Sequence, residues 1–253
     1  SFMDIQYLPY IFFLIALFYS SVGFGGGSSY LAIMSLFISD FYEIRTTALL
    51  LNVCVVTIGT TLFIRHRVFN FREFWPFLAA SIPMAYLGAQ LRLTQDVFFI
   101  ILGAALLLAA AFMILKFVRY TLRPRNFGLT RKLPLGGSVG LLAGVSGIGG
   151  GIYLSPLLNL LEWKNPRTIA SLASVFILVN SISGLLGLTV AGTFEVNPVL
   201  IVKLLVAVVL GGSIGSYLTN KKFNPRIVGI LTALLVGYVG LRLVLLHGFG
   251  IQI

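Results

Sequence analysis

The stretch "GVSGIGGGIYLSPLL", residues 144–158, places five glycines inside a long apolar segment. A second stretch, "SVGFGGGSSYLAIMSLF" at residues 21–37, contains the same Gly-x-Gly-Gly-Gly pattern 124 positions earlier. Glycine destabilises a helix by about 1 kcal/mol per residue relative to alanine. The two clusters therefore predict two broken helices at equivalent places in a duplicated chain.

The composition is suited to lipid. Of the 253 residues, 58% are hydrophobic and 10% are charged, whereas a soluble domain carries about 25% charged residues. Several apolar runs reach the roughly 20 residues that a spanning helix needs, and the short alternating segments of a barrel do not occur. We predict an all-α integral membrane protein. Its net charge of +11 is then expected in cytoplasmic loops rather than against nucleic acid.

The apolar segments fall into two sets of four on either side of a polar linker, residues 116–132. They cover residues 5–38, 44–64, 74–91 and 97–118, then 133–161, 168–190, 198–219 and 226–246. The motif "RTTALLLN" from Arg45 aligns with "RTIASLAS" from Arg167. We expect two membrane repeats, residues 1–122 and 123–253, which together form a single domain.

The charge bias indicates how these segments lie in the bilayer. If all eight crossed it, 10 Lys and Arg residues would face one side and 7 the other. If the two glycine-broken segments instead enter and leave on the same face, 14 face one side and 3 the other, as the positive-inside rule expects. The linker 116–132 is then cytoplasmic. With a re-entrant hairpin and three crossing helices in each half, the two repeats are inverted.

Arm lengths agree with re-entrant hairpins. The arms around the second break, residues 133–146 and 151–161, reach only about 21 and 17 Å at 1.5 Å per residue, short of a hydrocarbon core of about 30 Å. A half-helix that begins after each break presents free N–H groups and the positive end of its dipole. Two such ends near the midplane predict an anion-binding site at Gly25, Gly26, Gly27, Gly149, Gly150 and Gly151. Close helix packing is the alternative for these glycines.

Polar residues in the apolar segments supply further candidates. Asn52 and Asn180 are costly to bury, and we place them beside the substrate. The hydroxyls of Ser28, Ser29 and Ser155 follow the breaks and are expected to assist. The basic residues Arg45, Arg167 and Lys203 either attract anions and gate the path or anchor helix ends at the interface.

Ionisable groups that catalysis or metal binding would need are missing from the apolar segments. All seven acids and both histidines fall in loops or at segment ends. A membrane enzyme would need such groups at depth, so we expect neither an enzyme nor a bound metal or cofactor. A cation transporter would use a buried carboxylate. An anion pathway needs neither.

The duplicated Gly-x-Gly-Gly-Gly, the following "YLSPLL" from Tyr153 and the Arg-Thr-x-Ala of the next segment resemble the TauE/SafE sulfite-exporter family. The first half departs from the motif, with Ala32 in place of Pro156. The resemblance implies a multi-pass secondary transporter of a prokaryotic cell membrane that exports small sulfur-containing anions, such as sulfite, thiosulfate, sulfoacetate or related sulfonates, with proton coupling. An anion channel, a membrane enzyme and a scaffold subunit are the rival functions.

Overall fold

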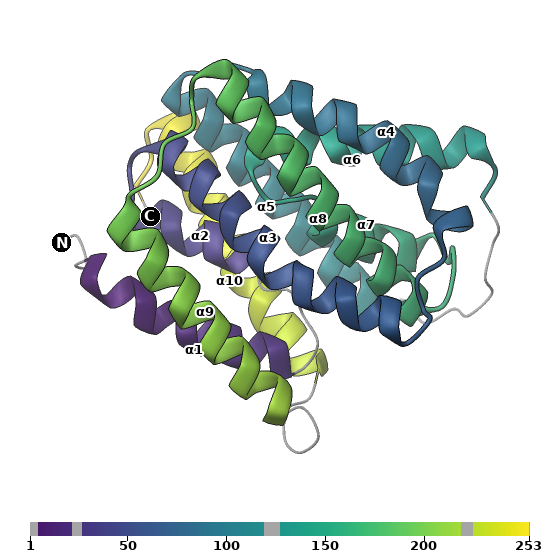
Figure 1. Cartoon of the computed structure of the whole chain (residues 1–253). Coiled ribbons are helices and arrows are strands. Elements are labelled where there is room, and N and C mark those ends of the chain that lie inside the picture. Colours follow the sequence, from purple (N-terminus) through teal and green to yellow (C-terminus); the bar gives the residue numbers. More distant parts are fainter. Residues whose placement is uncertain (1–4, 22–26, 119–126, 219–224, 253) are drawn as a thin grey trace.

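A computed structural model describes residues 5–21, 27–118, 127–218 and 225–252 (Figure 1). These residues form ten α-helices and a short 3-10 turn, Ile5–Tyr7, and they contain no strand. The first half holds α1 Leu8–Ser21, α2 Gly27–Phe37, α3 Phe41–Arg65, α4 Phe71–Gln90 and α5 Gln95–Val118. The second half holds α6 Leu129–Ser146, α7 Gly151–Leu160, α8 Pro166–Ala191, α9 Pro198–Leu218 and α10 Pro225–Phe249. The all-helical prediction is confirmed.

The eight predicted apolar segments coincide with these helices. Six of them correspond to the single helices α3, α4, α5, α8, α9 and α10. The two glycine-containing segments are each divided into a pair of helices, α1 with α2 and α6 with α7. Residues 119–126 of the polar linker lie outside the described residues, between Val118 of α5 and Phe127.

The second break follows from the backbone angles of its glycines. Gly147, Gly149 and Gly150 have φ values of +76°, +80° and +86°, a region that residues with a Cβ rarely enter. Gly147 ends α6, and its N–H donates to the carbonyl of Ala143 over 2.9 Å. Gly150 is the N-cap of α7. The glycine cluster therefore breaks the helix as predicted.

The α6–α7 hairpin returns to the end of the bundle from which it starts. Near the beginning of α6, Lys132 Nζ lies 2.8 Å from an oxygen of Glu73, in the first turn of α4. After α7, Lys164 Nζ lies 3.9 Å from the other oxygen of the same carboxylate. Both ends of the hairpin therefore lie at Glu73, as expected for a re-entrant segment.

Glycines allow α6 to run directly against α4. A Cβ added at Gly136 would lie 2.8 Å from Cα of Phe77, and one at Gly140 would lie 2.6 Å from Cα of Ser81. Contacts this short leave no room for a side chain, so these glycines serve close packing. α4 and α6 run in the same direction, so the break that follows α6 lies near the carboxyl end of α4.

The contacts between helices follow a pattern when the halves are exchanged. Each helix of α1–α5 corresponds in chain order to one of α6–α10. Under this exchange the packed pair α4–α6 becomes α9–α1, α5–α7 becomes α10–α2, and α7–α8 becomes α2–α3. The pairs α3–α8 and α5–α10 are unchanged.

The phenyl ring of Phe12 on α1 packs against the phenol ring of Tyr30 on α2, with centroids 4.8 Å apart.

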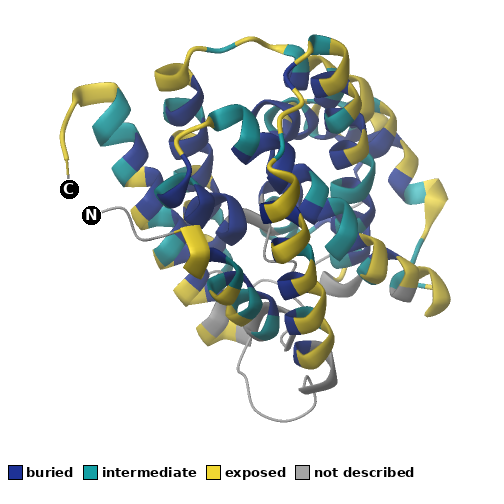
Figure 2. Cartoon of the chain, turned by 60° about the vertical axis from the view of Figure 1, so that its left-hand side comes forward, coloured by how far each residue is buried: buried dark blue, intermediate teal, exposed yellow. Residues whose placement is uncertain are grey.

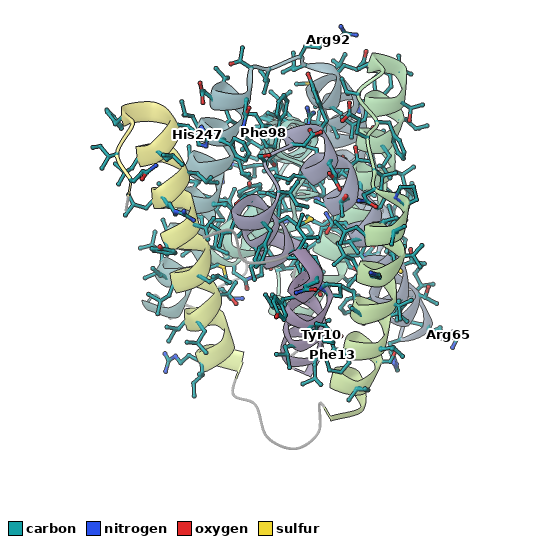
Figure 3. All side chains as sticks on the ribbon, turned by 90° about the vertical axis from the view of Figure 1, so that its left-hand side faces the viewer. Tyr10, Phe13, Arg65, Arg92, Phe98 and His247 are labelled. Atoms are coloured by element: carbon teal, nitrogen blue, oxygen red, sulfur yellow. The ribbon has the colours of Figure 1, made fainter. Side chains whose placement is uncertain are left out.

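The outer surface is suited to lipid. Five helices are long and apolar enough to cross a membrane: α3, α5, α8, α9 and α10. α4 is not among these five, because its charged first turn and its final glutamine lower its hydropathy. Large apolar side chains are exposed on the outward faces, whereas the centre is buried (Figure 2). Arg65 lies at the end of the bundle opposite Arg92 and His247 (Figure 3). The chain is therefore a multi-pass membrane protein.

Candidate functional site

The glycine break between α6 and α7 is buried inside the bundle. Residues 147–151 are all buried. A Cβ added at Gly149 would lie 2.8 Å from Cγ2 of Ile177 and 2.9 Å from Nδ2 of Asn52. One at Gly150 would lie 2.7 Å from the ring of Phe176. α3 and α8 therefore contact the break from two directions, and glycine alone fits at these two positions.

The break exposes the amino end of α7 to this buried region. The first intrahelical bonds of α7 are donated by the amides of Tyr153 and Leu154, which both reach the carbonyl of Gly150. The amides before them have no partner within the helix. Gly150, as N-cap, has no side chain that could accept from them. Their partial positive charge makes this position suitable for an anion.

Asn52 is held against the break. Its Nδ2 donates to the carbonyl of Ile148 over 3.1 Å, and its side chain is buried. Asn52 therefore contacts the glycine cluster of the other half of the chain, and its contact with an anion stays a prediction.

Two buried polar side chains of α8, those of Asn180 and Ser181, each have an atom that could form a further hydrogen bond. Ser181 is fully buried, and its Oγ lies 3.1 Å from a Cβ added at Gly149. Asn180 is also fully buried, and its Nδ2 donates to the carbonyl of Phe176 over 2.8 Å. Among the described residues, neither Oγ of Ser181 nor Oδ1 of Asn180 has a hydrogen-bond partner. Buried polar atoms without partners are rare, so each of these two atoms is a candidate to bind a polar ligand or water.

Arg45, on the first turns of α3, is fully buried rather than placed at an interface. Its Nη2 donates to the carbonyls of Ala89 over 2.9 Å and Gly144 over 3.1 Å. Its Cα would lie 3.2 Å from a Cβ added at Gly147. Arg45 is therefore packed directly beside the break, and its role in attracting an anion stays a prediction.

The other predicted site residues lie further from the break or outside the described residues. Ser155 is half-buried on α7, and its carbonyl accepts from Asn159. Ser29 is buried on α2. Lys203 is exposed on α9, and no contact with the break is described. Gly25 and Gly26 lie outside the described residues, as do the side chains of Ser28 and Arg167; Gly27 begins α2.

Ser181 and the hydroxyl pair at the α3–α8 contact were not among the residues predicted from the sequence. Ser181 lies four residues after Ile177, so both share a face of α8, but the sequence carries no signal that this face meets the glycine cluster. Thr60 Oγ1 and Ser174 Oγ lie 2.9 Å apart across the same contact. Ser174 aligns with Asn52 in the duplicated motif. This alignment gives α3 and α8 equivalent polar positions.

A separate hollow at the beginning of α3 has a different character. Its volume is about 620 Å³, and it is lined by Glu43 and the loop from Phe194 to Pro198. Hydrogen bonding to Asp40 and repulsion by its charge raise the pKa of Glu195 in this loop. Two carboxylates at this hollow disfavour an anion, so the break remains the better candidate.

The fold and the break define a class: a multi-pass helical membrane protein with a helix interrupted inside its bundle. The family model of the sulfite exporter TauE/SafE matches residues 8–243 of the chain. The protein belongs to this family of membrane transporters.

A curated relative agrees with this assignment. The "Probable membrane transporter protein y4hK" of Sinorhizobium fredii (strain NBRC 101917 / NGR234) is 30% identical over 240 residues, which cover 93% of this chain and 96% of the relative. No solved structure gives a significant match. The family and the relative are membrane transporters and not enzymes, as the sequence predicted.

Proposed function

We propose that the protein is a secondary transporter that exports a small sulfur-containing anion, such as sulfite, thiosulfate, sulfoacetate or another sulfonate, from a prokaryotic cell. The observation that carries this proposal is the buried break at residues 147–151, which Asn52 and the unpartnered hydroxyl of Ser181 approach. Asn180, next to Ser181 on α8, has a second buried oxygen without a described partner. The family model, which is that of a sulfite exporter, supports the choice of anion.

The chemistry of the break fits an oxyanion. Free amides at a helix amino end donate hydrogen bonds and carry partial positive charge. Ser181 can donate a further bond through its hydroxyl. No group of three or more His, Cys, Asp or Glu side chains that could hold a metal ion occurs among the residues described. The anion would therefore be bound by amides, hydroxyls and amide side chains.

Two inverted repeats would supply two such sites facing one pocket. The exchange of packed helix pairs between the halves supports this arrangement, and so does the motif shared by residues 21–37 and 144–158. In the proposal, Gly25, Gly26 and Gly27 with Ser28 and Ser29 form the first half of the site. Gly149, Gly150 and Gly151 with Ser155 form the second. Movement of one repeat against the other would open the pocket to each side in turn.

The proposed topology has a direct test. In a Cys54→Ser background, single cysteines at exposed Arg131 and Leu161, at the two ends of the second hairpin, should react with an impermeant thiol reagent from the cytoplasmic side only. A cysteine at Arg92 should react from the outside only. Labelling of positions 131 and 161 from opposite sides would contradict the re-entrant hairpin.

Anion binding is tested on the purified protein. Sulfite, thiosulfate, sulfoacetate and sulfate are each titrated while the melting temperature is measured, with Gly150→Leu as the variant that fills the break. We expect at least one sulfur anion to raise the melting temperature of the native protein, and no anion to stabilise Gly150→Leu. Equal stabilisation of both proteins would contradict the site.

Transport in proteoliposomes separates a carrier from a channel. Proteoliposomes preloaded with unlabelled anion accumulate labelled anion by counterflow if the protein is a carrier. They do not if the protein is a channel. Repeating the assay with an imposed pH gradient tests the proton coupling that the family resemblance implies. Counterflow that is independent of the pH gradient would contradict proton coupling but would still support a carrier.

A further inference from the structure

Arg45 is a buried cation whose hydrogen bonds are made only in part. The side chain is 0% exposed, and its guanidinium carbon lies 5.8 Å from the centroid of the Phe98 ring, which is also buried. Of its three nitrogen atoms, Nη2 alone has described partners, the carbonyls of Ala89 and Gly144. Nε and Nη1 have none among the described residues.

A counter-ion for Arg45 is also missing from the described part of the chain. No Asp or Glu oxygen described here lies within the 4.0 Å that defines a salt bridge to it. A buried charge is strongly unfavourable unless it is paired and hydrogen-bonded. The two carbonyls lie at the carboxyl ends of α4 and α6, whose dipoles supply only partial negative charge. The guanidinium thus retains a positive charge and donors at two nitrogen atoms for a further partner.

The position of Arg45 indicates what that partner is. Its Cα packs on Gly147, which is the first residue of the break, and Asn52 on the same helix reaches Ile148, the second. Arg45 and Asn52 are seven residues apart, two helical turns, so both face the break from one side of α3. A guanidinium is suited to the oxygens of a small oxyanion.

We propose that the Arg45 guanidinium neutralises the bound oxyanion and donates hydrogen bonds to it through Nε or Nη1. This assignment rests on the proposed function, and it adds a full positive charge to a site otherwise made of neutral groups. It also gives Arg45 a second effect, because the same side chain ties the ends of α4 and α6 beside the break. Anion binding is thereby linked to the packing of the second hairpin against α4.

The test compares two arginines that make the same kind of bond. Arg92 Nη2 donates to the carbonyl of Ala191 at the end of α8 over 2.9 Å, but its side chain is exposed. Thiosulfate affinity is measured by isothermal titration on the native protein and on Arg45→Gln, Arg92→Gln and Gly150→Leu. We expect Arg45→Gln to weaken binding by about tenfold or more, since a charged hydrogen bond and a neutralising charge are lost together. Arg92→Gln should bind as the native protein does.

The outcomes separate this inference from the proposed function. Native affinity in Arg45→Gln, with binding lost in Gly150→Leu, overturns the role of Arg45 and leaves the site at the break. If the native protein binds neither thiosulfate nor sulfite nor sulfoacetate, both are overturned. If Arg45→Gln does not fold, Arg45→Lys replaces it, because lysine keeps the charge but lacks the planar set of donors. Weaker binding by Arg45→Lys supports the inference, and unchanged affinity contradicts it.

Discussion

Asn52 Nδ2 donates a hydrogen bond over 3.1 Å to the carbonyl of Ile148, which joins the first half of the chain to the glycine break of the second. Ile148 lies between two glycines with positive φ, so the bond fixes a backbone that no regular helix supports. The side chain thus positions the amino end of α7 and lies beside the groups that would bind an anion.

Replacing Asn52 by Leu should weaken anion binding by about tenfold, because the carbonyl of Ile148 loses its donor while it remains buried. Titration calorimetry with thiosulfate measures the effect. Asn159→Leu is the control, since Asn159 bonds the carbonyl of Ser155 within α7 and should leave affinity unchanged. Equal affinities for Asn52→Leu and the native protein would show that the bond is not needed at the site.

Gly149→Ala should destabilise the protein more than Gly192→Ala does. Both glycines have positive φ, +80° and +71°, so each alanine introduces backbone strain of about 1–2 kcal/mol. The added Cβ meets Ile177 and Asn52 at position 149 and nothing within 4 Å at position 192. The melting temperature of each purified variant gives the comparison. A smaller loss for Gly149→Ala would mean that the break relaxes freely.

Gly140→Ala should disturb the α4–α6 contact, whereas Gly137→Ala should not. A Cβ at Gly140 would lie 2.6 Å from backbone atoms of Ser81, but one at Gly137 has its nearest neighbour at 3.7 Å, in the flexible side chain of Met84. Thermal unfolding should show a drop of several degrees for Gly140→Ala, as for a mutation of about 1–3 kcal/mol. If the two variants melt together, the helices are not held at this distance.

Glu195→Gln should raise the melting temperature at neutral pH and have little effect at acid pH. Asp40 raises the pKa of Glu195 above its ordinary value of 4.5 in the folded protein. A raised pKa favours folding while the carboxyl is protonated, and this contribution is lost as the pH rises through the folded-state value. Glutamine removes the repulsion that then remains. A melting curve series over pH, with Glu162→Gln as control, tests the sign, and a lower melting temperature at neutral pH would contradict it.

The sequence was sufficient to predict the helices and the break, because both depend on local chemistry. Apolar length fixed the segments, and the glycines at 147, 149 and 150 left the backbone no regular helix to continue. The return of the hairpin was predicted from the distribution of Arg and Lys, and the bonds from Lys132 and Lys164 to Glu73 agree with it.

Contacts between distant helices could not be predicted in the same way. Burial of Arg45 depends on α4, α5 and α6 closing around it, and nothing local to "RTTALLLN" distinguishes a buried arginine from an interfacial one. Ser181 was not selected for the same reason, since serine is common in membrane helices and only its position against Gly149 gives it significance. Lys203 was included on its charge alone, and its exposed position on α9 reflects the face of the helix on which it falls.

The most direct test of the central claim is to locate the anion. Selenate resembles a sulfur oxyanion and scatters X-rays anomalously, so a crystal of the protein soaked in selenate reports its position. We predict an anomalous peak within hydrogen-bonding distance of the amides of Gly149, Gly150 or Gly151 and of the Arg45 guanidinium. Strong selenate peaks that lie only on the surface, with the break filled by side chains or water, would contradict the account.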